Sequence, residues 1–362
     1  MDIRWQGEPG FPSPEAWDRF VSTCSHGHLL QSWQWGEFKG RFGWRPMRAV
    51  VLDEGGAIRA AAQLLLRRLP YRSLAYVPRG PACDPSDERP LQMLLDALHA
   101  AARRQGAIAL KVEPPWPDGA EAAAWWAGRG FRPSPQTIQP RRTIIVDLRP
   151  DEEAILAQMK PKWRYNVRLA ARKGITVRQG SAEDLPTFYS LMQETSRRDG
   201  FAIHVPAYYE AGYRLFAPDR VALLIAEYRG EPLAALMAFA CGRQAIYMWG
   251  ASSDRERPRM PNHLLQWEAM RWAKAHGCTE YDLWGIADVE PGSPSAGLAG
   301  VERFKAGFGG RDTRYAGAFD YVYSPLVYRA FTLLWARRRA AARRQQAREE
   351  SAPAEPNDAA AA

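Results

Sequence analysis

The order of the predicted elements constrains the fold most, because the two halves of the chain have the same order. In each half, helices precede three strand-like runs, and a further helix and a closing strand follow. The runs are residues 45–52, 57–66 and 73–77 in the first half, and 221–228, 233–241 and 244–249 in the second. The repeat predicts two similar α/β (α+β) domains with a cleft between them, where ligands commonly bind.

This order is similar to that of the GCN5-related acyltransferase (GNAT-like) fold, present twice in tandem. The repeat concerns the order of elements and not the identity of residues. No part of the chain resembles a coiled-coil arm. We therefore expect two GNAT-like domains, and the next question is which acyl donor they would bind.

The loops that would hold coenzyme A argue against that donor. A GNAT enzyme cradles the pyrophosphate in a glycine-rich loop, whose backbone N–H groups approach the phosphates closely. In the second half the corresponding loop, residues 255–262 (RERPRMPN), contains no glycine and has two prolines, which lack N–H donors. The matching loop of the first half, residues 78–85 (PRGPACDP), is also unsuited.

The charge of the chain indicates which classes of partner it could bind, and its cysteine content indicates the cellular compartment. The net charge is +9, and seven arginines lie between Arg329 and Arg348 with no acidic residue among them. An excess of basic residues favours partners such as RNA, nucleotides or anionic lipid head groups, although solvated arginines on a terminal helix are as common.

The four cysteines form no C-x-x-C pair, so we expect no metal and no disulfide framework. No secretory signal or membrane span is visible, which favours the cytoplasm.

Seven segments together carry a resemblance to a known family. They are residues 31–39 (QSWQWGEFK), 160–175, 198–209, 249–253 (WGASS), 261–269, 281–286 (YDLWGI) and 303–310 (RFKAGFGG). With all seven in this order, the chain resembles the Fem (FemA/FemB/FemX-type) family of non-ribosomal peptidyltransferases, which build peptidoglycan cross-bridges. The resemblance covers the chain to about residue 335.

The resemblance implies an aminoacyltransferase whose donor is aminoacyl-tRNA and which needs no cofactor. The implied acceptor is the side-chain amine of the stem-peptide lysine or diamino acid of a peptidoglycan precursor, either UDP-MurNAc-pentapeptide or lipid II. The expected domains are an acceptor-side domain, residues 1–145 with 318–347, and a donor-side domain, residues 146–317. Residues 348–362 are expected to be disordered. We expect a monomer in the cytoplasm, with association at the inner face of the membrane left open.

The resemblance also assigns roles to residues, each of which has a plainer structural alternative. Lys305 matches a lysine implicated in catalysis, which would place positive charge near the donor's 3′ end or the developing oxyanion. Lys39 matches a lysine that contacts acceptor phosphates, and Tyr208 an aromatic residue beside the same acceptor. His204 stands where the family can have arginine, and histidine binds phosphate less firmly at neutral pH. Solvated lysines are the alternative for Lys305 and Lys39.

The remaining candidates are less specific. Trp249 matches an aromatic position near the cleft, where core packing is an equal alternative, and Phe304, beside Lys305, is a substrate-binding candidate with core packing as its alternative. Glu113 would orient the acceptor's amine or simply cap a turn. Lys162, Arg164 and Arg168 lie on a basic helix suited to an RNA backbone, although such faces are often only solvated.

Two rival functions remain open from the sequence. The first is a GNAT acetyltransferase that uses acetyl-CoA on an amine or sugar in polysaccharide biosynthesis. The second is a non-catalytic protein that binds RNA or the cell envelope. The sequence leaves open which amino acid is transferred, how many are added, whether the acceptor is soluble or lipid-linked, and which group acts as base.

Overall fold

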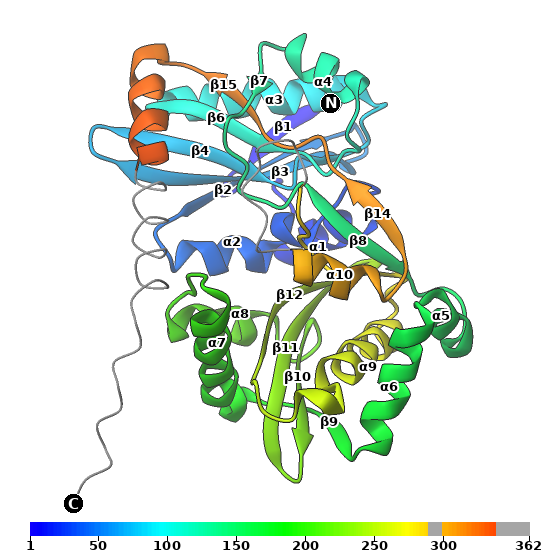
Figure 1. The fold of residues 1–362 in the computed structure, drawn as a ribbon. Coiled ribbons are helices and arrows are strands. Elements are labelled where there is room, and N and C mark those ends of the chain that lie inside the picture. Colours follow the sequence, from blue (N-terminus) through cyan, green and yellow to red (C-terminus); the bar gives the residue numbers. More distant parts are fainter. Residues whose placement is uncertain (289–298, 338–362) are drawn as a thin grey trace, which may run out of the picture.

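The computed structural model describes residues 1–288 and 299–337, which form two β-sheets with helices on their faces (Figure 1). The two sheets lie one above the other in this view, and helices α1 (Pro14–Thr23) and α2 (Trp33–Gly40) lie between them. This arrangement confirms the predicted mixed α/β fold. No described helix is both long enough and apolar enough to cross a membrane.

The first sheet has the strand order β1-β2-β3-β4-β6-β15-β7, with β5 paired to β3. The strands are β1 (Asp2–Trp5), β2 (Arg45–Leu52), β3 (Ile58–Leu69), β4 (Arg72–Pro78), β5 (Ala82–Cys83), β6 (Ala107–Glu113), β7 (Arg132–Pro133) and β15 (Phe319–Val322). Helix α3 (Glu88–Arg104) packs its leucine stripe against β2, β3 and β6. The short helix α4 (Ala120–Ala127) adds Trp126 to the same core.

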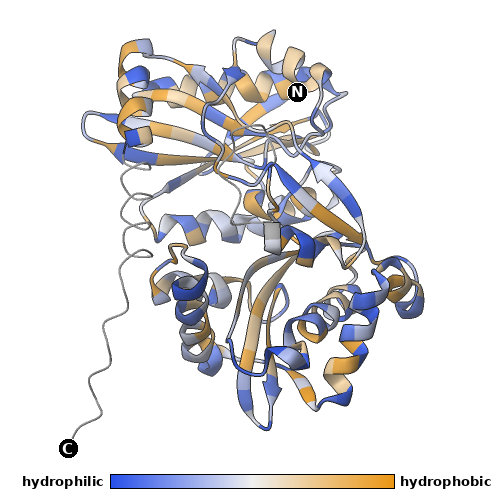
Figure 2. Ribbon diagram, viewed as in Figure 1, coloured by the Kyte–Doolittle hydropathy of each residue, from blue (hydrophilic) through white to orange (hydrophobic). Residues whose placement is uncertain are grey.

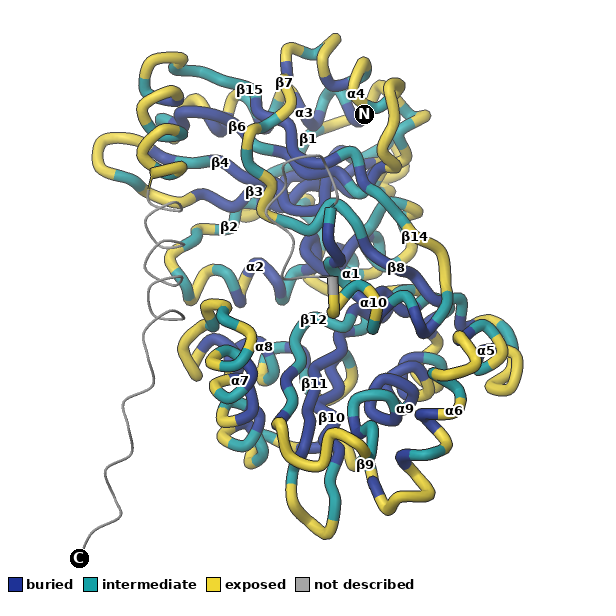
Figure 3. Tube along the Cα trace, viewed as in Figure 1, coloured by how far each residue is buried: buried dark blue, intermediate teal, exposed yellow. Residues whose placement is uncertain are grey.

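The second sheet has the strand order β14-β8-β13-β12-β11-β10-β9. Its strands are β8 (Arg142–Asp147), β9 (Ile175–Gln179), β10 (Val221–Tyr228), β11 (Glu231–Cys241), β12 (Gln244–Ser252), β13 (Glu280–Asp282) and β14 (Arg311–Arg314). One face is covered by α5 (Glu152–Gln158), α6 (Pro161–Arg172) and α9 (Pro261–Ala275), and the other by α7 (Leu185–Asp199) and α8 (Pro206–Phe216). The hydropathy of the residues (Figure 2) and their burial (Figure 3) follow these layers.

A single apolar cluster joins the two halves. It contains Trp17, Phe38 and Val50 from the first half together with Phe188 and Phe239 from the second. Helix α2 is held at its start by Ser32, whose hydroxyl accepts the Trp35 N–H at 3.3 Å. The shared core fixes α2 against α8, and this contact positions the acceptor-side residues described below.

The C-terminal segment returns to the first sheet. Strand β15 pairs antiparallel with β6 and β7, and residues 325–337 form a helix after it. Strand β8 spans residue 145, the predicted limit of the first domain, and belongs to the second sheet. The division into acceptor-side and donor-side domains stays a prediction, and residues 338–362 lie outside the described residues.

Three local features of the structure were not predicted. Strand β13 ends at Asp282, because the Asp282 carboxylate accepts the Trp284 N–H at 2.7 Å and Trp284 turns to a φ of 59°. Lys305 lies in a helix, α10 (Ala299–Ala306). Strands β8 and β14 were not predicted, and they pair with each other across more than 160 residues of chain.

Candidate active site

Lys305 is the buried cation of the second half. Only 7% of its surface is exposed, and its Nζ donates to the carbonyl oxygens of Gly285 at 2.8 Å and Trp284 at 3.4 Å. The Nζ also lies 5.4 Å from the centre of the Tyr247 ring. Burial lowers the pKa of Lys305 to about 8, against the opposing effect of Asp282. Near neutral pH the ammonium form therefore prevails, but its proton is held less firmly than that of a solvated lysine.

A tight turn after β13 positions the two carbonyl oxygens that accept hydrogen bonds from Lys305. The Thr143 hydroxyl lies within hydrogen-bond distance of the Asp282 carboxylate and of the Trp284 carbonyl oxygen, the latter at 3.0 Å. Asp282 is fully buried, and its Oδ2 has no hydrogen-bond partner among the described residues. Burial raises the pKa of Asp282, an effect that Thr143, the Trp284 N–H, Arg79 and Lys305 reduce. No pattern in the sequence indicates that Asp282 lies beside Lys305.

Helix α6 supports α10 from the side. The Trp163 indole N–H donates to the carbonyl oxygen of Phe304 at 2.9 Å. Phe304 is half-buried, and its ring packs against His263 and Phe308 at centroid distances of 5.3 and 5.1 Å. A Cβ on Gly307 would lie 1.9 Å from the Trp163 ring, so only glycine fits there. The contact fixes α10 relative to α6.

The predicted RNA-binding residues lie on this same helix α6. Lys162 and Arg168 are exposed, and Arg164 is half-buried with one N–H on the Ala157 carbonyl oxygen at 3.3 Å. None of the three forms an ion pair within residues 1–288 and 299–337. Their charges are thus available to an anionic partner beside α10.

The structure brings four predicted acceptor residues together between the two sheets. The Lys39 Nζ donates to the Tyr208 hydroxyl at 3.2 Å. The His204 ring stacks on Tyr208 with centroids 3.8 Å apart, and the Trp249 ring lies 5.8 Å from Tyr208. Burial, with a smaller effect of Arg67, lowers the pKa of Lys39 to about 8. Burial and Lys39 also lower the pKa of His204, so this imidazole is neutral near pH 7.

Glu113 ends strand β6 in a buried site of its own. Its carboxylate accepts the Tyr76 hydroxyl and the backbone N–H groups of Ile138, at 2.5 Å, and Gln139, at 3.1 Å. Burial raises the pKa of Glu113, and these hydrogen bonds reduce the effect. Glu113 thus caps the turn at residues 138–139, and within the described part of the chain it forms no hydrogen bond with Lys39 or Tyr208.

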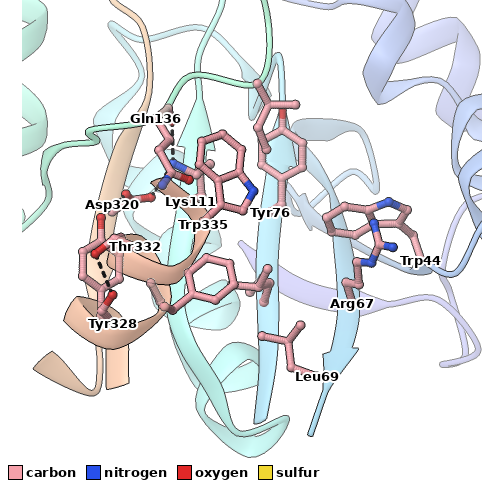
Figure 4. Close-up of a pocket in the computed structure, with 15 residues that line it drawn as sticks. Trp44, Arg67, Leu69, Tyr76, Lys111, Gln136, Asp320, Tyr328, Thr332 and Trp335 are labelled. Carbon is pink, nitrogen blue, oxygen red and sulfur yellow. Dashed lines mark hydrogen bonds and ion pairs between the residues drawn. The ribbon is translucent and has the colours of Figure 1, made fainter. Parts of the chain in front are cut away.

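A cavity of about 400 Å³ lies between the first sheet and the helix of residues 325–337 (Figure 4). Trp44, Tyr76 and Trp335 give it aromatic walls, and Arg67 brings positive charge, whereas Lys111 is paired with Asp320 at 2.9 Å. Tyr76 connects its wall to Glu113, and Arg67 lies near enough to Lys39 to lower the pKa of that lysine. The cavity therefore lies between the two predicted acceptor-side positions.

A family model described as the FemAB family matches residues 13–121, 120–231 and 225–335. The chain belongs to the FemAB family. Lipid II:glycine glycyltransferase of Staphylococcus saprophyticus is 30% identical over 87% of this chain and 93% of that protein. The crystal structure of FemX covers 91% of this chain and 99% of its own, with a TM-score of 0.83 and 25% identity. A tandem GNAT protein from the clavulanic acid biosynthesis pathway, at 15% identity and a TM-score of 0.53, covers 88% of this chain and 98% of its own.

These likenesses confirm the predicted family and the tandem GNAT-like fold. This FemAB chain is an aminoacyltransferase, as the sequence predicts. The roles of the individual site residues stay predictions.

The loop before α9 in this FemAB protein differs from a pyrophosphate loop in its structure as well. Arg257 pairs with Asp254 at 3.1 Å, and Arg255 pairs with Glu231. Met260 has a φ of 60° immediately before Pro261 starts the helix. The arginines of the loop are thus neutralised by carboxylates, and no run of glycine N–H groups opens toward a ligand.

Sequence reasoning missed Arg79, which lies between the two buried carboxylates. Arg79 is 2% exposed, its guanidinium lies 3.9 Å from the Tyr315 ring centre, and it donates to the Pro140 carbonyl oxygen at 2.5 Å. Its charge lowers the pKa values of both Glu113 and Asp282. Nothing distinguishes Arg79 within a chain of 49 lysines and arginines, so only the fold reveals this position.

Proposed function

We propose that this aminoacyltransferase moves an amino acid from aminoacyl-tRNA to the side-chain amine of the stem-peptide lysine or diamino acid of a peptidoglycan precursor. The amine attacks the carbonyl carbon of the aminoacyl ester, an amide bond forms, and the ester bond to the ribose oxygen breaks. The proton that the amine loses goes to the leaving oxygen, so the reaction needs no further reactant. The product carries the first residue of an interpeptide bridge.

The observation that carries the proposal is the buried Lys305 ammonium beside the exposed basic helix α6. Helix α6 offers unpaired positive charge to an RNA backbone, and its Trp163 is hydrogen-bonded to the residue preceding Lys305. An aminoacyl ester held there would place its carbonyl oxygen near a cation in a water-poor site, where charge stabilisation is strong. Catalysis would then consist mainly of positioning and electrostatics.

Lys39, His204, Tyr208 and Trp249 are proposed to bind the acceptor, with Lys39 on its phosphates. The glycyltransferase relatives support a lipid-linked acceptor, lipid II, over the soluble UDP-linked one. With an acceptor of this kind the enzyme would work as a monomer at the cytoplasmic face of the membrane. The donor side, residues 146–317, and the acceptor side, residues 1–145 with 318–347, would then meet at α2, α8 and α10.

The donor is tested by offering the purified protein an acceptor with either charged tRNA or acetyl-CoA. We expect a product only with charged tRNA, and no saturable binding of acetyl-CoA in calorimetry. Acetylated product together with saturable acetyl-CoA binding would instead support the acetyltransferase, which the loop before α9 disfavours.

The Lys39→Met variant is expected to bind the acceptor about tenfold or more weakly, because a charge-assisted hydrogen bond to phosphate is lost. In the wild type, affinity should fall as pH rises through about 8, where Lys39 loses its proton. Calorimetry with a soluble UDP-linked acceptor between pH 6.5 and 9 measures both effects. If the variant binds the acceptor with wild-type affinity, or if its affinity has the same pH dependence as that of the wild type, Lys39 does not bind the acceptor phosphates.

A further inference from the structure

One end of the first sheet carries large apolar side chains that face solvent. Tyr71, at the tip of the turn between β3 and β4, has a relative exposure of 101%. On the helix of residues 325–337, Leu326 is 82% exposed, and Leu333 and Leu334 are 59% exposed each. Isolated exposed leucines are ordinary. Three exposed leucines on one helix beside a fully exposed tyrosine form an apolar patch, and such patches mark interaction sites.

This helix is apolar on two opposite sides. Tyr328, Phe331 and Trp335 face the sheet and line the cavity of Figure 4. Leu326, Leu333 and Leu334 lie on the other side, which also holds Ala330 and Arg337 at helical spacing. Residues 325–337 contain arginine but no aspartate or glutamate. The outer side is therefore apolar with basic flanks.

Next to this helix lies an open cavity of about 550 Å³ with four arginines in its wall. These are Arg45, Arg68, Arg72 and Arg104, and no acidic side chain lines the cavity. Arg45 donates to the side chain of Gln105, and none of the four forms an ion pair with any residue that the structure describes. Elsewhere most surface arginines have a carboxylate partner, as Arg178 does with Asp184 at 2.6 Å. Four unpaired guanidinium groups around one hollow fit phosphate groups.

The apolar patch and the arginine cavity are continuous. Leu69 and Trp44 line both this cavity and the cavity of Figure 4, which the helix of residues 325–337 closes on the other side. Tyr71 lines the arginine cavity directly. The turn between β3 and β4 and the last described helix lie side by side at this end of the molecule (Figure 1). The surface made by residues 67–73, Arg45, Arg104 and the outer side of helix 325–337 is called the basic-apolar end below.

We propose that the basic-apolar end binds the surface of an anionic phospholipid bilayer. The four arginines would take lipid phosphates, and Tyr71 and the three leucines would enter the boundary between head groups and acyl chains. Charge alone would serve RNA equally well, but exposed leucines gain nothing from a phosphate backbone, whereas burial in lipid stabilises them.

The inference deepens the proposed function, since it rests on an acceptor carried by a membrane lipid. Binding at this end would keep the cavity of Figure 4 close to the bilayer, where a lipid-linked acceptor presents its phosphates. Vesicle binding is measured without either substrate, so its result is independent of whether the enzyme transfers an amino acid.

The test is co-sedimentation of the full chain with phosphatidylcholine vesicles that contain none or about a third phosphatidylglycerol. The wild type should bind only the anionic vesicles, and more weakly at high salt. The pair Arg68→Gln and Arg72→Gln should lower the partition coefficient about 25-fold, at roughly fivefold for each arginine near the surface. The pair Leu326→Ser and Leu333→Ser should lower it on the order of tenfold.

Matched controls lie on the same molecule. Arg104→Gln should weaken binding about fivefold, whereas Arg89→Gln, on the first turn of the same helix α3 and roughly 22 Å away, should have no effect. Tyr71→Ser should weaken binding, whereas Tyr165→Ser, at a residue 54% exposed on α6, should not. All variants except Tyr165→Ser, which lies on the proposed tRNA-binding helix, should keep wild-type transfer to a soluble UDP-linked acceptor, and the melting temperature of every variant shows that it is folded.

Three results would overturn the proposal. The wild type could fail to bind anionic vesicles, or the controls could lose as much binding as the variants. The arginine pair could also weaken binding of tRNA and leave vesicle binding unchanged, which would make this end an RNA surface. Normal vesicle binding by a wild type that transfers no amino acid would contradict the proposed function and leave this inference standing.

Discussion

Lys305→Ala is expected to lower the rate of amino-acid transfer by about 100-fold to 1,000-fold while the protein stays folded. The loss is that of one preorganised donor to developing negative charge in a water-poor site. The Lys305 Nζ is held on the Gly285 and Trp284 carbonyl oxygens, so its position does not depend on the substrates. Single-turnover transfer measures the change, and the melting temperature shows whether the fold survives.

The pH dependence of the transfer rate shows whether Lys305 acts as a charged ammonium group or as a neutral amine. Burial favours the neutral amine and brings the pKa down to about 8, so the ammonium form is lost as pH rises through that value. If the charge stabilises the transition state, the wild-type rate relative to that of Lys305→Arg should fall above pH 8. The ratio cancels titration of the acceptor's own amine. A ratio that rises above pH 8 would make Lys305 a base, and a Lys305→Ala rate within fivefold of the wild type would remove it from the chemistry.

Gly307→Ala is expected to have the second largest effect, on both stability and rate. The added Cβ would lie 1.9 Å from the Trp163 ring, so the ring or helix α10 must move. The hydrogen bond from Trp163 to the Phe304 carbonyl oxygen would be strained or lost. Overpacking of this kind costs about 1–3 kcal/mol, and displacement of Lys305 should lower the transfer rate more than tenfold.

Gly300→Ala is the matched control for Gly307→Ala. It lies on helix α10, which ends immediately before Gly307, and a Cβ there would meet no described atom within 4 Å. Alanine should stabilise the helix by about 0.5–1 kcal/mol and leave the rate unchanged. Thermal unfolding and transfer are measured for both variants. Equal behaviour of the two would show that the fit of Gly307 against Trp163 is not what positions Lys305.

Local signals predicted much of the fold. Residues 221–228 were predicted with the bounds that β10 has, because an R-G-E-P turn ends the strand. Strands β8 and β14 were missed, because each is short and finds its partners far away in the chain. Their pairing places Thr143 beside Asp282, which no local pattern indicates.

The candidate site divides in the same way. The family resemblance supplied Lys305, Lys39, His204 and Tyr208, and the fold brings the last three into contact. The groups that change the pKa values of the site residues could not be predicted from the sequence. Arg79 lies more than 200 residues from Asp282, yet its charge lowers the pKa of that carboxyl. Pairings of this length depend on the tertiary fold and leave no periodic signal in the chain.

The most direct test of the central claim is transfer of a labelled amino acid from charged tRNA to a purified precursor. Mass spectrometry of the product locates the new amide bond. We predict the label on the side-chain amine of the stem-peptide lysine or diamino acid, and no product when the charged tRNA is first digested with ribonuclease. Undiminished transfer after ribonuclease treatment, or a label on any other group of the precursor, would contradict the account.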